Sequence, residues 1–161
     1  MSGFHSSNQR AAHRSDDAIL NGRLDSIQAA VLLEKLKIFP DEIAARNRTA
    51  ARYSDALADA AIVPRVGNQS TSVWAQYTIR LPKGHRDPLA AALKAQGIPT
   101  AIYYPKPLHR QQAYRQFPSV EGGLAVSERL ADEVISLPMH AYLDAATQDR
   151  IIAAVRGALG R

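Results

Sequence analysis

Residues 134–143 read Val-Ile-Ser-Leu-Pro-Met-His-Ala-Tyr-Leu, and they mark a change from strand to helix. The apolar run Val134–Leu137 predicts a short buried strand. Pro138 ends it, because proline has no backbone N–H to donate to a sheet ladder. Asp144 then predicts the cap of a last helix, since its carboxylate can accept from the first free N–H groups.

The sequence before this stretch alternates helical and strand patterns. Apolar residues at helical spacing start at Leu24, and Pro40 interrupts them, which predicts two helices or one long kinked helix. Further elements are predicted, in order, as a strand over 73–81, a helix capped by Asp87 and stopped at Gly97, a strand over 100–104 and a helix after Gly122-Gly123. Together they predict an α+β fold, a small three-stranded sheet packed on helices.

The composition narrows the classes of protein. The 161 residues are 46% hydrophobic, but much of this is alanine, so a thin core is expected. A net charge of +5 would suit a polyanionic partner, yet the arginines are scattered and not interleaved with aromatic residues, so no nucleic acid is expected. With 0 Cys, disulfides and thiolate catalysis are excluded. No membrane span or signal peptide is predicted, and a cytoplasmic location is expected.

Two other motifs have a structural and a functional interpretation. Asn21-Gly22-Arg23 stands where a polar arm, residues 1–20, meets the first long helix, and Asn21 could be a plain helix cap. Tyr103-Tyr104-Pro105-Lys106-Pro107-Leu108-His109 follows a predicted strand end. Its tyrosines could pack beneath a proline turn, or they could project into a site.

In this order and spacing, the motifs Asn21–Asp25, Tyr103–His109 and Ser136–Leu143 resemble the C-terminal part of the DegT/DnrJ/EryC1/StrS family. These are sugar aminotransferases that use pyridoxal phosphate (PLP). The resemblance implies the small C-terminal domain of the aspartate-aminotransferase-like fold (fold type I) over residues 21–161, after a flexible arm over 1–20. Two positions depart from the family pattern: Tyr103 replaces a histidine and Ala141 replaces a proline.

The resemblance also implies roles for individual residues. Asn21 would reach the PLP phosphate of the partner subunit in a homodimer, and Arg23 would bind the carboxylate of a sugar. Arginine suits that task because its fork binds a carboxylate bidentately. Tyr103, Tyr104 and His109 would bind substrate. Because Tyr103 stands in place of histidine, hydrogen bonding is expected from it, but not proton transfer near neutral pH. The motifs are most similar to enzymes that aminate a 3-keto group on a nucleotide-linked uronic acid.

The lysine that such chemistry needs is not recognisable in this sequence. PLP transaminases use a lysine amine as Schiff base and proton shuttle. None of the five lysines has the family's Ser-x-x-x-x-Lys context; they are Lys35, Lys37, Lys83, Lys94 and Lys106. No catalytic residue and no metal site is therefore predicted. The chain is expected to be a truncated product, a separately encoded half or a remnant, inactive alone, whose partner is a lysine-bearing large-domain half or a second copy.

A second hypothesis is a non-enzymatic regulatory or interaction protein that kept this fold and uses its basic surface. An upstream reading frame for the lysine-bearing half would favour the first hypothesis. An isolated gene whose product binds a polyanion would favour the second.

Overall fold

The computed structural model describes residues 24–161. The expected arm over 1–20, Asn21 and Arg23 lie outside this part of the chain. A boundary between Ile38 and Phe39 separates two compact units, and each is considered by itself.

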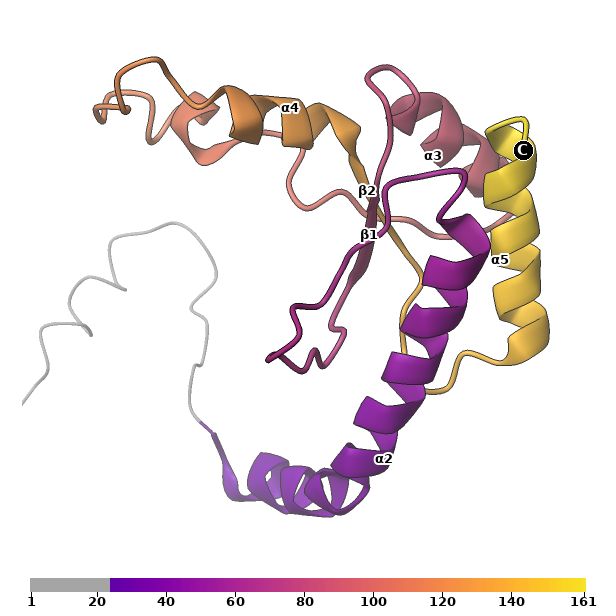
Figure 1. Ribbon diagram of the computed structural model, residues 1–161. Helices are drawn as coiled ribbons and strands as arrows, with labels where there is room; N and C mark the ends of the chain where they lie inside the picture. Colours follow the sequence, from indigo (N-terminus) through magenta and orange to yellow (C-terminus); the bar gives the residue numbers. More distant parts are fainter. Residues whose placement is uncertain (1–23) are drawn as a thin grey trace, which may run out of the picture. The chain divides into compact units, whose positions relative to one another are not determined.

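The first unit contains the beginning of helix α2, which spans Ser26–Leu57 and includes Pro40 (Figure 1). The structure confirms one long helix rather than two. Asp25 starts it, because its Oδ1 accepts from the Gln28 N–H at 2.7 Å. The apolar side chains before Phe39 are exposed; they are Leu24, Ile27, Val31, Leu32, Leu33, Leu36 and Ile38.

The second unit is built on a pair of antiparallel strands, β1 (Tyr77–Arg80) and β2 (Val134–Leu137). Tyr77 pairs with Leu137 and Arg80 with Val134. The expected three-stranded sheet is wrong for the described residues, in which the sheet has two strands. The segment 100–104 contributes a single bridge, in which Ala101 and Ser136 exchange N–H···O bonds of 3.2 and 2.8 Å. Pro105 and Pro107 then limit further pairing, because neither has a donor.

The strand expected over 73–81 is also shorter than its alternating pattern. Trp74 has a φ of 48°, a left-handed conformation that interrupts an extended chain. Its indole N–H donates to Asn47 Oδ1 at 3.0 Å, and its carbonyl accepts from Arg46 at 3.0 Å. These contacts attach the residues before Tyr77 to α2 instead of to a sheet.

The remaining α-helices follow the expected order. They are α3 (Arg86–Ala95), α4 (Ala125–Glu133) and α5 (Ala145–Ala158). A short 3-10 helix, η1 (Leu108–Arg110), was not predicted from the sequence. Asp87 is not the cap of α3: His85 holds that position, and Asp87 lies in the first turn. Gly97 does end the helix, with a φ of 70° that favours glycine. Asp144 caps α5, accepting from the Thr147 N–H at 2.8 Å.

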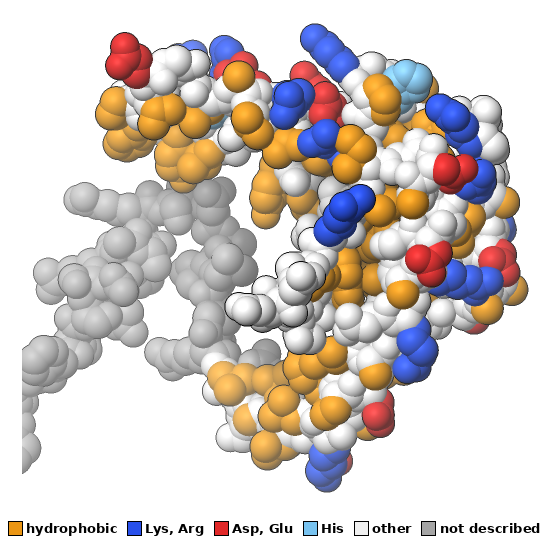
Figure 2. All heavy atoms as spheres, in the orientation of Figure 1, with side chains coloured by type: hydrophobic (Ala, Val, Ile, Leu, Met, Phe, Trp, Pro, Cys, Tyr) orange, Lys and Arg blue, Asp and Glu red, His pale blue; other side chains and the backbone are white. Residues whose placement is uncertain are grey.

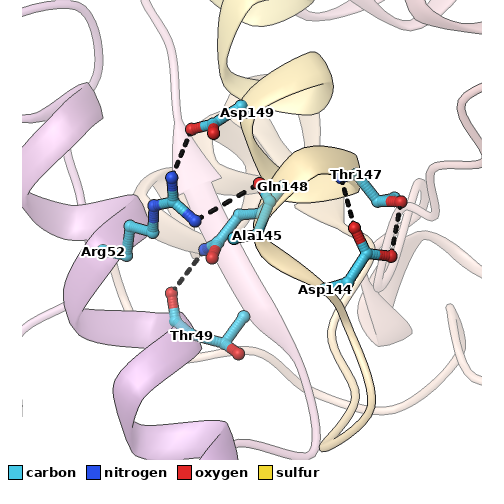
Figure 3. A network of polar contacts seen from close by, with 7 residues as sticks. All are labelled: Thr49, Arg52, Asp144, Ala145, Thr147, Gln148 and Asp149. Carbon is cyan, nitrogen blue, oxygen red and sulfur yellow. Dashed lines mark hydrogen bonds and ion pairs between the residues drawn. The ribbon is translucent and has the colours of Figure 1, made fainter.

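The core of this unit lies where α2, the sheet, α3 and α5 meet (Figure 1). Its largest fully buried side chains are Tyr53, Tyr77, Leu57, Ile79, Leu81, Leu89, Leu93, Ile98, Ile135, Ile151 and Val155. Polar contacts join α2 to α5 beside it (Figure 3). Gln148 donates to the Thr49 carbonyl at 2.7 Å in a buried position, and Arg52 binds Asp149 at 2.5 Å. These contacts hold α2 against α5. The segment 102–119, which follows Ala101, takes no part in them.

Candidate functional site

A groove of about 930 Å³ lies between the segment that follows Ala101 and helix α4. Most of its exposed lining is apolar or aromatic. Its lining side chains include Tyr103, Tyr104, His109, Tyr114, Phe117 and Leu130. Hydrophobic side chains gather over the part of the second unit that contains α4 (Figure 2). A concave, mostly apolar surface with a few polar groups is typical of a ligand site.

Three of the residues singled out from the sequence come together here. Tyr103, Tyr104 and His109 all line the groove. The tyrosine side chains do not pack beneath a turn: Tyr103 is 46% exposed and Tyr104 72% exposed. Their rings lie edge to face with centroids 5.9 Å apart. Both side chains are therefore partly open to solvent at the groove, where a ligand could contact them.

His109 is held by a residue that the sequence patterns did not reveal. Its Nε2 lies 2.9 Å from Glu128 Oε1, and Arg110 Nε donates to the same oxygen at 2.9 Å. Hydrogen bonds from His109 and then from Arg110 lower the pKa of the Glu128 carboxyl below its ordinary value. Glu128 is therefore a carboxylate at neutral pH and joins η1 to α4.

Sequence reasoning missed Glu128, Tyr114 and Phe117. Glu128 stands in the first turn of α4, where an acidic residue is ordinary on helix-dipole grounds alone. Nothing in the spacing links it to a histidine on another segment. Tyr114 and Phe117 lie in a segment of turns without periodicity, so their place on the groove wall comes only from the fold.

The stretch 136–143 makes several contacts that hold the fold together. Ser136 is buried, and its hydroxyl pairs with that of Thr78 at 2.7 Å. The Pro138 carbonyl accepts from the hydroxyl of buried Tyr53 at 3.1 Å. Tyr142 bonds to Glu42 on α2. These contacts secure the end of β2 to α2.

The groove does not by itself have the donor set of a PLP site. Lys106 is the lysine in its lining, and its side chain is exposed to solvent rather than enclosed beside a cofactor site. Among the residues that the structure describes, the lining offers no carboxylate to pair with a pyridinium nitrogen. Within the described part of the chain there is also no cluster of three or more His, Cys, Asp or Glu that could hold a metal ion.

Residues 2–156 match the DegT/DnrJ/EryC1/StrS aminotransferase family. The chain belongs to this family. A relative from Pseudomonas aeruginosa, a UDP-2-acetamido-2-deoxy-3-oxo-D-glucuronate aminotransferase, is 44% identical over 84% of this chain and 37% of its own length. A "pleiotropic regulatory protein" from Geobacillus stearothermophilus is 39% identical over 82% of this chain and 36% of its own length. The chain thus spans little more than a third of the curated relatives it matches.

Solved structures agree with this assignment. A DegT/DnrJ/EryC1/StrS aminotransferase from Brucella abortus superposes with a TM-score of 0.82 at 51% identity, covering 92% of this chain and 39% of that one. A sugar aminotransferase from Streptococcus pneumoniae in its PLP form shares the fold at a TM-score of 0.76 and 20% identity, covering 91% of this chain and 40% of that one. Members of the DegT/DnrJ/EryC1/StrS family are PLP-dependent.

Within residues 24–161, no helix combines the length and the apolar character that crossing a membrane requires.

Proposed function

We propose that residues 21–161 are the C-terminal domain of a PLP-dependent nucleotide-sugar aminotransferase. The reaction is amino transfer from glutamate to a 3-keto sugar for polysaccharide biosynthesis, with a nucleotide-linked uronic acid as substrate. The observation that carries the proposal is the 44% identity to an aminotransferase of a UDP-linked 3-oxo-glucuronate. A charged nucleotide sugar does not cross a bilayer unaided, so we also propose that the enzyme works in the cytoplasm.

In this proposal the chain supplies binding residues rather than the reacting amine. Asn21 holds the cofactor phosphate, and Arg23 binds the uronic-acid carboxylate through a bidentate ion pair. Tyr103, Tyr104 and His109 bind the substrate from the groove. When bound, PLP provides the electron sink that the transfer requires. The tyrosine hydroxyls and the one His109 ring nitrogen that is not bonded to Glu128 orient the sugar.

The Schiff-base lysine then has to come from outside residues 1–161, because none of the lysines here has the Ser-x-x-x-x-Lys context. A large-domain half, joined to this domain or encoded separately, supplies it. A homodimer would let Asn21 of one copy reach the cofactor of the other. The chain alone is expected to be inactive.

The assembled enzyme allows a sharp test of Arg23. With the lysine-bearing half present, Arg23→Ala should weaken binding of a uronic-acid substrate and spare a neutral sugar analogue. Loss of a buried charge partner costs about 2–5 kcal/mol. Arg23→Lys, the matched control, keeps the charge but not the fork, so its loss should be intermediate. Equal losses on charged and neutral sugars would reduce Arg23 to a folding role.

A second candidate function rests on the 39% identity to a protein named as a pleiotropic regulator. On that hypothesis the chain keeps the fold without the chemistry and binds a polyanion through its basic surface. Borohydride reduction with PLP separates the two. A single reduced lysine on the lysine-bearing half, with turnover, supports the aminotransferase. No adduct, together with polyanion binding, supports the regulator.

A further inference from the structure

Glu128 is not among the residues proposed to bind a ligand, but one of its carboxylate oxygens binds two side chains of the groove wall. One carboxylate oxygen, Oε1, accepts from His109 Nε2 at 2.9 Å, from Arg110 Nε at 2.9 Å, and lies 2.8 Å from a terminal nitrogen of Arg110. The His109 side chain is 18% exposed and that of Glu128 40% exposed. The contact is thus shielded on the histidine side and reaches solvent on the other.

This contact joins the groove wall to α4 by side-chain hydrogen bonds. Within described residues 105–119, the side-chain hydrogen bonds that reach another element end on Glu128. Two others are local, from Gln111 to the Lys106 carbonyl and from Gln116 to the Ala113 carbonyl. Because much of this segment is turns around one short 3-10 helix, its own backbone bonds cannot fix its distance from α4.

The chemistry of the contact also fixes the histidine ring. An ionised carboxylate only accepts hydrogen bonds, so Nε2 must carry the hydrogen. In the neutral ring the hydrogen-bond acceptor is then Nδ1. The Arg110 guanidinium places a permanent positive charge beside the same oxygen, and this favours the ionised form of Glu128.

We propose that Glu128 is a positioning residue: it holds His109 in the Nε2–H tautomer against the groove wall, so that Nδ1 is offered to the hydroxyl of a bound sugar. The part that concerns the sugar rests on the proposed function, whereas the part that concerns the tautomer does not. Glu128 does not itself touch the ligand, and it acts through His109.

The first arm of the test needs no nucleotide sugar. Nitrogen-15 spectra of the His109 ring are recorded at about pH 8.5, above the ordinary titration range of histidine. The wild-type chain should show a single tautomer with the hydrogen on Nε2. Glu128→Gln should show a mixture of both, since an amide can accept from Nε2 or donate to it. Glu121→Gln, a change of the same charge at an exposed position, is the matched control and should match the wild type.

The second arm measures binding of UDP-glucuronic acid to the enzyme assembled with its lysine-bearing half. Glu128→Gln should raise the Kd by up to about tenfold, the effect expected when one oriented hydrogen bond to the ligand is lost. Glu121→Gln should leave it unchanged. Arg110→Gln serves as a second variant if Glu128→Gln does not fold. It keeps the Glu128–His109 bond, so the single tautomer should persist.

The outcomes separate the two proposals. A wild-type ring with its hydrogen on Nδ1, or the same spectrum in Glu128→Gln, overturns the positioning role. Equal binding by wild type and Glu128→Gln overturns the link to the ligand. If the expected tautomers are found but the assembled wild type binds no UDP-glucuronic acid, the positioning role stands and the proposed function fails.

Discussion

Tyr53 and Tyr77 join α2 to the sheet through two buried hydroxyls. Tyr53 donates to the Pro138 carbonyl at 3.1 Å, and Tyr77 pairs with Ser54 Oγ at 2.8 Å. Their rings lie 5.0 Å apart. Burial raises the pKa of both phenols, and for Tyr53 the neighbouring Tyr77 raises it further. Each phenol therefore keeps its proton in the folded state at a pH where the unfolded chain has lost it.

The sign of the pH dependence follows. Above a pH of about 10 the folded state binds more protons than the unfolded state, so the free energy of unfolding should fall as pH rises. Tyr53→Phe should lower it by about 1 kcal/mol at neutral pH, through the lost hydrogen bond. The same change should make the alkaline decline shallower. Urea unfolding at neutral pH and at pH 9 and 11 measures both effects. Tyr114→Phe, on the exposed groove wall, should change neither; an unaltered decline in Tyr53→Phe would contradict the linkage.

At the same scale, the candidate site was only partly predictable. Tyr103, Tyr104 and His109 lie close together in one short motif, and proline-limited turns keep such a motif compact, so their common location could be read from sequence. Glu128 could not, because its contact with His109 depends on how α4 returns to the sheet. The positive φ of Trp74 escaped for the same reason: it is set by Asn47 on α2, not by local preference.

Among the elements, the helices were more predictable than the strands. Asp144 and Gly97 mark helix ends through contacts with their own neighbours, and both assignments are confirmed. The strand over Val134–Leu137 is also confirmed, because a buried apolar run and Pro138 define it. The strand expected over 100–104 is wrong because an extended, alternating segment forms a strand only when a partner runs beside it, and pairing here stops at Ala101.

Two glycines, one at the end of α3 and one inside α5, allow a direct test of how α3 ends. Gly97 has a φ of 70°, whereas Gly157 lies within α5, and neither would bring an added Cβ within 4 Å of another atom. Gly97→Ala should therefore destabilise the fold by about 1–2 kcal/mol through backbone strain alone. Gly157→Ala should stabilise it by about 0.5–1 kcal/mol. Thermal unfolding of both variants checks the contrast. A stabilised Gly97→Ala would show that the left-handed conformation is absent in solution.

At the scale of the whole molecule, the apolar side chains that stay exposed say more about function than the buried core does. Core residues are fully buried in the second unit, yet large apolar side chains stay exposed in both units. In the first unit Ile27 is 79% and Leu33 63% exposed, and in the second Phe117 is 60% exposed. Extended apolar surface of this kind generally marks an interface or an aggregation site. On the proposed function, this is the surface against which the rest of the enzyme would pack.

We therefore expect the isolated chain to self-associate. Since these side chains are largely exposed, replacing them should change association without unfolding the protein. Ile27→Lys combined with Leu33→Glu should lower the average mass measured by light scattering at high concentration, and should leave the circular dichroism and the unfolding midpoint unchanged. Arg65→Glu is the control: it introduces an acidic side chain at an exposed polar position. Because it removes no apolar surface, the average mass should not fall.

If the unaltered chain is a monodisperse monomer that binds no apolar dye, the exposed residues are not an interface. If the double variant associates as strongly as the unaltered chain, the contact lies elsewhere, and the groove wall around Phe117 becomes the next surface to alter.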